Sequence, residues 1–334
     1  MKMKNRVHIT SLYGLGGIAG VAQKRAVEAA KQLGFNELAI FKYDDLADSP
    51  SELSKRIDGI IAGLEIGDTV IFQSPVWISP NFEKRFIDKV KAYQGKVIIF
   101  INDVPSMMFA SNEVLMPDFI EVYNKADLLI VSSENMKEYL VDKGVTVKKI
   151  IIQNLWDIPV EFEKSSETKY LSKISFAGSD KKFGISEKLK SSDIKVEIYD
   201  NRPDSKEIPD NIHYSGYVDE ISLLSRLHEG GFGLVWTEDM YWREYMKYNA
   251  SYKVSTYLRA GIPIVAHKSI SCANLIEKNN WGILVDTLEE AVEVINNMSE
   301  EEYQKYIDSV SKVSFLLGNN WFTKKLLVDA IYEL

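Results

Sequence analysis

The stretch NASYKVSTYLRAGIPIV, residues 249–265, holds one helix followed by one strand and so indicates how the whole chain is built. Asn249 or Ser251 can cap the helix, because a short side-chain oxygen accepts hydrogen bonds from first-turn amides. Gly261 ends the helix, and the Ile-Pro-Ile-Val that follows is typical of a strand. Repetition of such units predicts a parallel sheet covered by helices.

Lys253 lies in the first turn of this predicted helix, at the positive end of the helix dipole. A cation there typically costs about 0.3–1 kcal/mol. A bound phosphate would turn that cost into a charge-assisted hydrogen bond, because the first-turn amides already favour an anion. The position therefore indicates a diphosphate site at Lys253, with a solvated surface lysine as the alternative.

The composition is that of a globular protein, since 46% of the 334 residues are hydrophobic, 26% are charged and the net charge is −8. This length predicts two domains. Nucleic-acid binding is not expected, because the longest basic run is Lys-Lys. A single cysteine, Cys272, excludes an intramolecular disulfide, and no segment approaches the roughly 20 apolar residues of a membrane span. We therefore expect a cytoplasmic protein.

Strand-like and helix-like segments alternate along two stretches of the chain. The predicted strands are Val7–Thr10, Leu38–Tyr43, Thr69–Gln73, Val97–Ile101, Leu128–Ser132, Lys149–Gln153, Ile174–Gly178, Val196–Tyr199, His213–Tyr217, Phe232–Trp236, Ile262–Ala266 and Ile283–Val285. The clearest predicted helices are Val21–Leu33, Glu52–Leu64, Phe82–Tyr93, Asn135–Lys143, Glu220–His228, Leu288–Met298, Glu300–Leu317 and Phe322–Leu334. Apolar strands separated by helices predict two doubly wound α/β domains.

The domain boundaries follow from a change in character at residues 156–172, a stretch rich in Glu, Lys and Ser without clear periodicity. We expect a linker there, with an N-terminal Rossmann-like domain over residues 1–156 and a C-terminal one over 173–318. A last helix at 319–334 would pack on the N-terminal domain or on a partner subunit. Because ligands bind where parallel strands end, function is sought in loops that follow strands.

The loop SLYGLGGIAG, residues 11–20, follows the first predicted strand and is rich in glycine. Its glycines are Gly14, Gly16, Gly17 and Gly20. They would let the backbone approach an anionic ligand closely. Gly14-x-Gly16-x-x-Ala19 also satisfies a loose dinucleotide fingerprint, with Asp44 placed to bind a ribose. A tight strand-to-helix turn is the alternative.

Two loops of the second domain carry further candidates. FAGSDKKF, residues 176–183, places Ser179 with Lys181 or Lys182 at a strand end, where they could reach the same diphosphate. Solvated lysines are the alternative. In HYSGYVDE, Tyr214 or Tyr217 could stack on a nucleobase, or either tyrosine could pack in the core.

In the first domain, INDVPSMMF places Asn102 and Asp103 at the end of the fourth predicted strand. Asp103 could bind or deprotonate an acceptor hydroxyl, and a turn before Pro105 is the alternative. Trp77, after the third strand, could serve as a platform for a sugar. Signatures of a metal site or of an activated serine were not found in the sequence, and its four histidines are dispersed.

With these residues in place, the chain resembles the twin-Rossmann glycosyltransferases called GT-B. More closely, it is similar to bacterial glucosyltransferases that extend sugars on serine-rich-repeat adhesins. The matching stretches are RVHITSLYG, RIDGIIAGLEIGDTVIFQSPVW, GGFGLVW, SYKVSTYLRAGIPIVAHK and WFTKKLLVDAI. The resemblance implies two domains facing a central cleft, UDP bound by the second domain, acceptor bound by the first, and no metal or cofactor. It also implies a homo-oligomer, either a dimer or a tetramer.

Two departures from the GT-B pattern are visible. Many retaining members carry a Glu-x7-Glu motif, but the corresponding positions here are Tyr248 and Thr256. Their phosphate and ribose contacts must then be made by other groups, with Lys253 the best candidate. Related sequences often read HDVVP where this one has NDVP, so a histidine role in acceptor handling does not carry over to Asn102.

Taken together, the residues and the resemblance predict transfer of a hexose, most simply glucose, from a UDP-sugar to N-acetylglucosamine linked to Ser or Thr of a serine-rich-repeat glycoprotein. Lys253 and Asp103 are the expected catalytic residues, and Trp77 and Asn102 the acceptor-binding ones. The expected donor-binding residues are Gly16, Gly17, Gly20, Ser179, Lys181, Lys182, Tyr217, Asn249, Ala250, Ser251, Tyr252, Val254 and Ser255. Transfer of galactose, N-acetylglucosamine or galactofuranose, an NAD-dependent oxidoreductase, and a non-catalytic UDP-binding scaffold are the alternatives.

Overall fold

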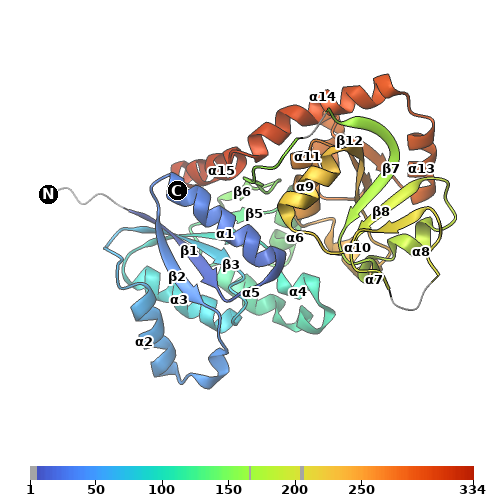
Figure 1. Cartoon of the computed structure of the whole chain (residues 1–334). Helices are drawn as coiled ribbons and strands as arrows, with labels where there is room; N and C mark the ends of the chain where they lie inside the picture. The colour runs from blue at the N-terminus through green and yellow to red at the C-terminus, as the bar shows by residue number, and fades with distance from the viewer. Residues whose placement is uncertain (1–5, 165–166, 204–206) are drawn as a thin grey trace. The chain divides into compact units, whose positions relative to one another are not determined.

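The chain folds into two compact units in a computed structural model that describes residues 6–164, 167–203 and 207–334 (Figure 1). Unit 1 comprises the chain up to Asn154 together with Phe322–Leu334, and unit 2 comprises Leu155–Trp321. Each unit contains one six-stranded parallel sheet. The prediction of two doubly wound α/β domains is confirmed.

The sheet of unit 1 has the strand order β2-β1-β3-β4-β5-β6. Its strands are β1 (Val7–Tyr13), β2 (Asn36–Phe41), β3 (Thr69–Ser74), β4 (Lys96–Ile101), β5 (Leu128–Val131) and β6 (Ile150–Ile152). The helices of this unit are α1 (Gly17–Gln32), η1 (Asp45–Ala47), α2 (Pro50–Ile60), α3 (Pro80–Ala92), α4 (Pro105–Met108), η2 (Ala110–Leu115), α5 (Met116–Tyr123), α6 (Glu134–Asp142) and, from Phe322 on, α15 (Trp321–Glu333).

The sheet of unit 2 has the order β12-β11-β10-β7-β8-β9. Its strands are β7 (Lys169–Ala177), β8 (Lys195–Tyr199), β9 (Ile212–Tyr214), β10 (Gly230–Val235), β11 (Ile264–His267) and β12 (Gly282–Val285). The helices are α7 (Asp180–Phe183), α8 (Ile185–Leu189), α9 (Glu220–His228), α10 (Met240–Tyr245), α11 (Tyr252–Ala260), α12 (Ala273–Asn279), α13 (Leu288–Asn296) and α14 (Glu300–Leu317).

The strand orders locate the ligand-binding edge of each sheet. In an open parallel sheet, ligands bind beyond the carboxyl ends of the strands, where the chain order reverses. In unit 1 that reversal lies between β1 and β3, and in unit 2 it lies between β7 and β10. The loop at 11–20 and the loop of Trp77 follow the first pair of strands. The loop at 176–183 and the segment that leads into α11 follow the second pair.

The stretch at 156–172, which the sequence analysis predicted to be a linker, belongs to unit 2. Trp156 and Ile158 are buried, and the guanidinium of Arg259 donates to the backbone carbonyls of Ile158 and Val160 at 3.1 and 2.6 Å. Strand β7 then begins at Lys169, inside the predicted linker. Two apolar anchors and a buried arginine hold this stretch in place despite its polar composition; residues 165 and 166 lie outside the described residues.

Several short helices were missed. The structure has α4, η2 and α5 between residues 105 and 123, and α7, α8, α10 and α12 in unit 2. All seven have eight residues or fewer, too short for an apolar periodicity to stand out. Strand β1 also runs to Tyr13, three residues beyond the prediction, because Leu12 and Tyr13 pair with the end of β2.

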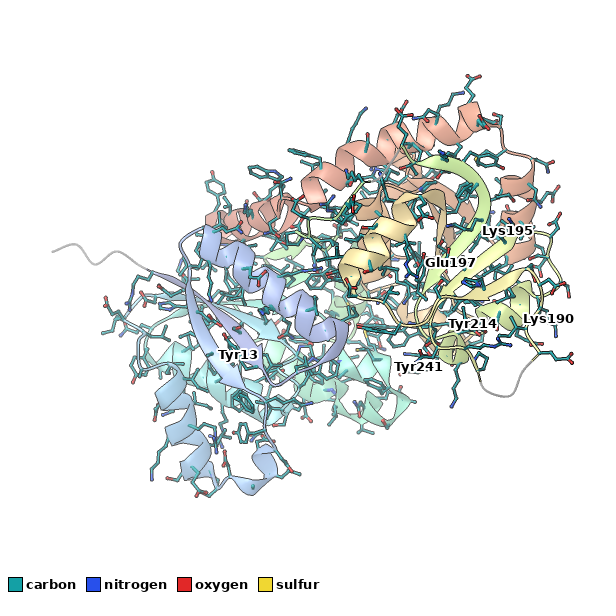
Figure 2. The ribbon with its side chains drawn as sticks, viewed as in Figure 1. Tyr13, Lys190, Lys195, Glu197, Tyr214 and Tyr241 are labelled. Carbon is teal, nitrogen blue, oxygen red and sulfur yellow. The ribbon has the colours of Figure 1, made fainter. Side chains whose placement is uncertain are left out.

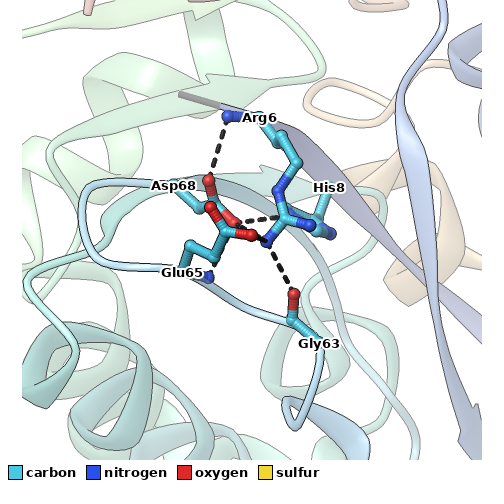
Figure 3. A network of polar contacts seen from close by, with 5 residues as sticks. All are labelled: Arg6, His8, Gly63, Glu65 and Asp68. Carbon is cyan, nitrogen blue, oxygen red and sulfur yellow. Dashed lines mark hydrogen bonds and ion pairs between the residues drawn. The ribbon is translucent and has the colours of Figure 1, made fainter. Parts of the chain in front are cut away.

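A buried carboxylate stabilises the start of unit 1, at the edge of the sheet opposite the strand ends (Figure 3). Asp68, 1% exposed, accepts hydrogen bonds from the guanidinium and backbone amide of Arg6, from the amide of Glu65 and from the ring of His8, at 2.8–2.9 Å. These four donors lower its pKa to about 2 despite burial, which acts in the opposite direction. None of the described helices is long and apolar enough to cross a membrane.

The last helix completes unit 1 from the far end of the chain. Leu326, Leu327 and Ala330 are buried in α15. The ammonium groups of Lys96 and Lys149 donate to backbone carbonyls at the end of this helix, with distances of 3.3 Å to Leu334 and 2.6 Å to Glu333. Unit 1 is therefore made from two separate stretches of the sequence.

Candidate functional site

Helix α11 places Lys253 beside the end of β7. Four residues further along the same helix face, Tyr257 packs flat against β10, where a side chain on Gly233 would come within 2.1 Å of the tyrosine ring. The Tyr257 hydroxyl also accepts a hydrogen bond from the amide of Ala177, the last residue of β7, at 2.9 Å. Residues four apart share a helix face, so the position of Tyr257 fixes that of Lys253.

The Lys253 ammonium lies among aromatic rings rather than carboxylates. It is 4.6 Å from the ring centre of Phe183 and 5.7 Å from that of Phe176. Its Cε and Nζ atoms lie 3.0 and 3.3 Å from the position that a Cβ would take on Gly178. Within the part of the chain that the structure describes, no side chain forms an ion pair with Lys253. An ammonium group in this setting is suited to an anionic ligand.

A second ammonium, that of Lys182, lies near the first. It is 3.7 Å above the ring centre of Trp242, within the range of a cation–π contact. Burial lowers the pKa of Lys253 to about 8, and repulsion from Lys182 adds to this effect. Burial also lowers the pKa of Lys182. The charge of Asp239 acts on Lys182 in the opposite direction. Two ammonium groups near each other are suited to a group with two negative charges.

The loop that carries Lys182 is held by Asp180. The Asp180 carboxylate accepts from the amide and hydroxyl of Ser186 at 2.8 and 2.5 Å and from the Tyr214 hydroxyl at 2.7 Å; Tyr214 is labelled in Figure 2. The amide of Asp180 donates to Asp200 at 2.8 Å. Tyr214 thus supports this loop. The sequence analysis had proposed that it stacks on a nucleobase or packs in the core, and did not include this role.

The remaining predicted donor-binding residues fall into three groups. The first group, Ala250, Val254 and Ser255, is buried. The Ala250 carbonyl accepts a hydrogen bond from the indole nitrogen of Trp156 at 2.9 Å, and the Ser255 hydroxyl accepts one from the backbone amide of Trp156 at 3.0 Å. Those at the surface are Ser179, Lys181 and Tyr217, the last 86% exposed. At the start of α11 lie Asn249, Ser251 and Tyr252.

The start of α11 keeps free hydrogen-bonding capacity. Ser251 is the N-cap residue, but its side chain makes no capping hydrogen bond, contrary to the prediction that it can cap the helix. The Oδ1 atom of Asn249 is buried and has no partner among the described residues. The first-turn N–H groups of a helix are suited to an anion, whereas Asn249 Oδ1 is an acceptor and would pair with an N–H or O–H group of a ligand.

The glycine loop of unit 1 begins α1 at Gly17, with Gly16 as the N-cap residue. Gly14 and Gly17 have positive φ angles of 79° and 73°, which favour glycine. A side chain on Gly20 would lie 2.4 Å from the carbonyl oxygen of Leu15, whereas Gly16 and Gly17 face open space. Asp44 caps the short helix η1, because its carboxylate accepts from the amide of Leu46.

The loop of Trp77 is anchored by a buried glutamate that the sequence analysis missed. Glu83, 1% exposed, accepts from the Ser74 hydroxyl at 2.7 Å and from the Val76 amide at 2.8 Å. Burial raises its pKa to about 7. From sequence it is an ordinary acidic residue in the first turn of a helix, since the signal of a loop that folds back onto it is not local. The Trp77 indole nitrogen is buried without a partner among the described residues.

Asn102 and Asp103 follow β4, next to β3, as predicted from their sequence positions. The Asn102 amide nitrogen donates to Gln73 Oε1 at 3.3 Å, and its backbone amide donates to the Ser74 carbonyl at 2.8 Å. The nearby Tyr123 hydroxyl has its pKa raised by burial, and the charges of Glu83 and Asp103 act in the same direction. The structure therefore brings Trp77, Asn102 and Asp103 to one edge of the sheet, at the ends of two neighbouring strands.

Comparison with solved structures identifies the fold. The Anabaena Alr3699/HepE protein, solved with UDP and glucose, matches over 99% of this chain and all of its own, with a TM-score of 0.70 and 9% identity. A sucrose-phosphate synthase from Thermosynechococcus elongatus matches over 99% of both chains, with a TM-score of 0.67 and 10% identity. At these identities the likeness concerns the fold, and the fold is that of the GT-B glycosyltransferases.

Comparison with sequence families defines the chain more closely. The N-terminal domain of the glucosyltransferase 3-like family matches residues 6–155, and the C-terminal domain of that family matches residues 174–330. The chain belongs to this family and is a hexosyltransferase. The predicted resemblance is confirmed, and the family supports a transferase rather than the alternative oxidoreductase.

Individual relatives agree with the family. Glucosyltransferase 3 of Streptococcus gordonii is 44% identical over 334 residues, covering 98% of this chain and 99% of its own. Glucosyltransferase 3 of Streptococcus parasanguinis is 36% identical over 98% of both chains. The β-1,6-galactofuranosyltransferase WbbI of Escherichia coli K12 is 22% identical over 84% of both.

Proposed function

We propose that this hexosyltransferase moves glucose from UDP-glucose to N-acetylglucosamine already linked to Ser or Thr of a serine-rich-repeat glycoprotein. The observation that carries the donor assignment is the Lys253 ammonium, which lies beside Gly178 with no carboxylate partner among the described residues. The glucosyltransferase 3 relatives support glucose as the sugar.

In the proposed reaction, the bond from the anomeric carbon to the β-phosphate oxygen breaks and a bond to the acceptor oxygen forms. Lys253 and Lys182 offset the negative charge that develops on the departing UDP, which is the usual electrostatic contribution to such transfers. The acceptor hydroxyl proton leaves to a base, for which we propose Asp103. With two ammonium groups to neutralise the diphosphate, the reaction is proposed to need no metal ion.

The remaining predicted site residues receive roles within the same proposal. Asn249, Ser251 and Tyr252 would place first-turn groups of α11 around the diphosphate. Tyr217, exposed after β9, would stack on uracil. Trp77 and Asn102 would bind the acceptor sugar.

The solution state and compartment are also proposals. Exposed apolar side chains near the end of the chain support a homo-oligomer: Phe315, Leu316, Val328 and Tyr332 are 39–86% exposed. The single cysteine, Cys272, is free and buried, and this low cysteine content supports a cytoplasmic location. Light scattering during gel filtration would measure the mass of the particle in solution. A monomeric mass would contradict the proposed homo-oligomer.

A panel of UDP-sugars tests the function directly. The purified chain would be incubated with UDP-glucose, UDP-galactose, UDP-N-acetylglucosamine or UDP-galactofuranose and a peptide bearing N-acetylglucosamine on serine, and the products weighed by mass spectrometry. We expect one hexose added from UDP-glucose, with the same rate in EDTA. Addition from another donor would change the assigned sugar, and UDP binding by calorimetry without any product would favour the scaffold.

A further inference from the structure

Three buried amide side chains lie near the strand-order reversal of unit 1, and one of them, that of Gln73, orients a predicted acceptor-binding residue, Asn102. Gln23 comes from α1, Gln73 from β3, and Asn102 from the residue after β4. Their exposed fractions are 2%, 1% and 8%. Buried amides are expensive unless they are hydrogen-bonded, so their partners decide how each is oriented.

The orientation of Gln73 follows from its partners. Its Nε2 atom lies 2.8 Å from the Thr10 carbonyl oxygen and 3.2 Å from that of Gln23. A carbonyl oxygen can only accept a hydrogen bond, so the nitrogen of the Gln73 amide must face these two atoms. The Oε1 atom is therefore the end of Gln73 that faces Asn102.

The same logic fixes Asn102. An oxygen on Gln73 requires a donor opposite, and the Nδ2 atom of Asn102 lies 3.3 Å away. Its Oδ1 atom therefore faces away from Gln73, and none of the described residues donates a hydrogen bond to that atom. A buried acceptor left unsatisfied costs about 1–3 kcal/mol. A ligand that supplies an N–H or O–H group would recover this free energy.

The helix that begins at the glycine loop also takes part. The Nε2 atom of Gln23 donates to the Pro75 carbonyl at 2.8 Å, which adds to the contacts of Glu83 in holding the loop of Trp77. The backbone N–H of Gln73 donates a hydrogen bond to the Thr10 hydroxyl at 2.8 Å. Gln73 is thus fixed by both its backbone and its side chain, which suits a residue that orients another.

We propose that Gln73 is a positioning residue that holds the Asn102 amide with its oxygen available for a hydroxyl or acetamido N–H of the acceptor saccharide. The proposal rests on the proposed function and deepens it. A neutral amide cannot take up the proton of the acceptor hydroxyl, so Asn102 recognises the acceptor and leaves proton removal to another group.

The test is a double-mutant cycle on acceptor kinetics with Gln73→Met, Asn102→Ala and the double variant. KM for the N-acetylglucosamine peptide and KM for UDP-glucose would be measured for each. We expect each single change to raise the acceptor KM roughly tenfold, because one hydrogen bond to the acceptor is lost. The UDP-glucose KM should stay within twofold. The double variant should match Asn102→Ala, because Gln73 acts through Asn102.

Gln153→Met is the matched control, since Gln153 is another buried glutamine of unit 1 outside these three amides. Its acceptor KM should equal that of the parent. Multiplicative effects in the double variant, or equal rises of both KM values, would show that Gln73 only stabilises the fold and would overturn the proposal.

Asn102→Asp keeps the test open if Gln73→Met does not fold, as judged by circular dichroism. When ionised, this carboxylate places an acceptor oxygen opposite Gln73 Oε1, so the acceptor KM of the variant should exceed that of the parent. When protonated at low pH, it donates to Gln73 and its other oxygen accepts from the ligand, so the acceptor KM should approach that of the parent at the same pH. An Asp variant whose acceptor KM relative to the parent does not change with pH would overturn the role of the oxygen. Failure of the parent protein to transfer any hexose would instead refute the proposed function, so the two failures are distinguishable.

Discussion

The Cε atom of Lys253 lies 3.0 Å from the position that a Cβ atom would take on Gly178. Gly178→Ala should therefore displace the end of the lysine side chain. Gly178 also has a φ angle of 158°, which residues with a side chain rarely adopt, so the melting temperature should fall while UDP binding weakens by up to about tenfold, or 1.4 kcal/mol. Calorimetry with UDP measures this. Gly59→Ala, on an open face of α2, is the control and should leave binding unchanged; equal affinity in both variants would contradict the placement of Lys253.

The charge of Lys253 should make UDP binding depend on pH. Its pKa is about 8 in the free protein, and a bound diphosphate stabilises the charged form and raises this pKa. Between about pH 7 and 8, where the terminal phosphate of UDP is already fully ionised, affinity should be nearly constant, and it should fall as the pH rises above 8. In Lys253→Met, binding should be roughly ten- to hundredfold weaker, as expected for a lost charge-assisted bond of about 1.5–3 kcal/mol, and the fall above pH 8 should disappear.

Calorimetric titrations at several pH values test this, with Lys268→Met as the control because Lys268 is paired with Asp286 at the surface. A sloping profile that persists in Lys253→Met would assign the titration to another group. At neutral pH Lys253→Met should also melt at a higher temperature than the parent, since burial disfavours the ammonium in the folded state.

Asp68 should make the protein acid-sensitive. Its pKa is about 2 in the folded state and near 3.9 in an unfolded chain, so it stabilises the fold above pH 4. This stabilisation, roughly 2 kcal/mol, should be lost as the pH falls from 4 toward 2. Asp68→Asn should cost about 3–5 kcal/mol at pH 7, because Arg6 and His8 lose a buried partner.

Urea unfolding followed by circular dichroism would measure both effects on Asp68. The variant should show a weaker loss of stability below pH 4 than the parent. If the two proteins lose stability in parallel, the acid sensitivity comes from other carboxylates.

Glu83 should give the opposite pH dependence. Its pKa is about 7 when folded and near 4.3 when unfolded, so the folded state binds more protons between these values. Its contribution to stability should therefore decline as the pH rises from 4 to 7. Relative to the parent, Glu83→Gln should gain roughly 3 kcal/mol across that range, measured as the difference in unfolding free energy at pH 5 and pH 8. A difference that does not vary with pH would show that Glu83 titrates normally.

The sequence was sufficient where one segment decides its own structure. The near-continuous apolar runs of β3 and β10 and the stop at Gly261 predicted elements close to those observed. Lys253 was also selected as a candidate from its place in a helix, because a cation at that end is locally unfavourable. These signals lie within a few residues of the position that they describe.

The missed features depend on residues far apart in the chain. Glu83 is distinctive only because Ser74 and Val76 fold back onto it, and the amide of Asn102 is fixed only through Gln73. The exposed first half of β7 lacks the apolar pattern of a buried strand, and so its residues were assigned to a linker. Strand order, which locates both binding edges, cannot be obtained from local patterns at all.

The discontinuity of unit 1 has a consequence for biosynthesis. Unit 2 is one uninterrupted stretch, whereas unit 1 needs Phe322–Leu334 to bury the apolar face of its last helix. A ribosome working from the N-terminus must therefore deliver all of unit 2 before unit 1 is finished. During translation the first domain usually completes its folding first, but this order is reversed for this polypeptide. Nascent unit 1 remains incomplete, with the surface that α15 covers exposed, until unit 2 has been synthesised.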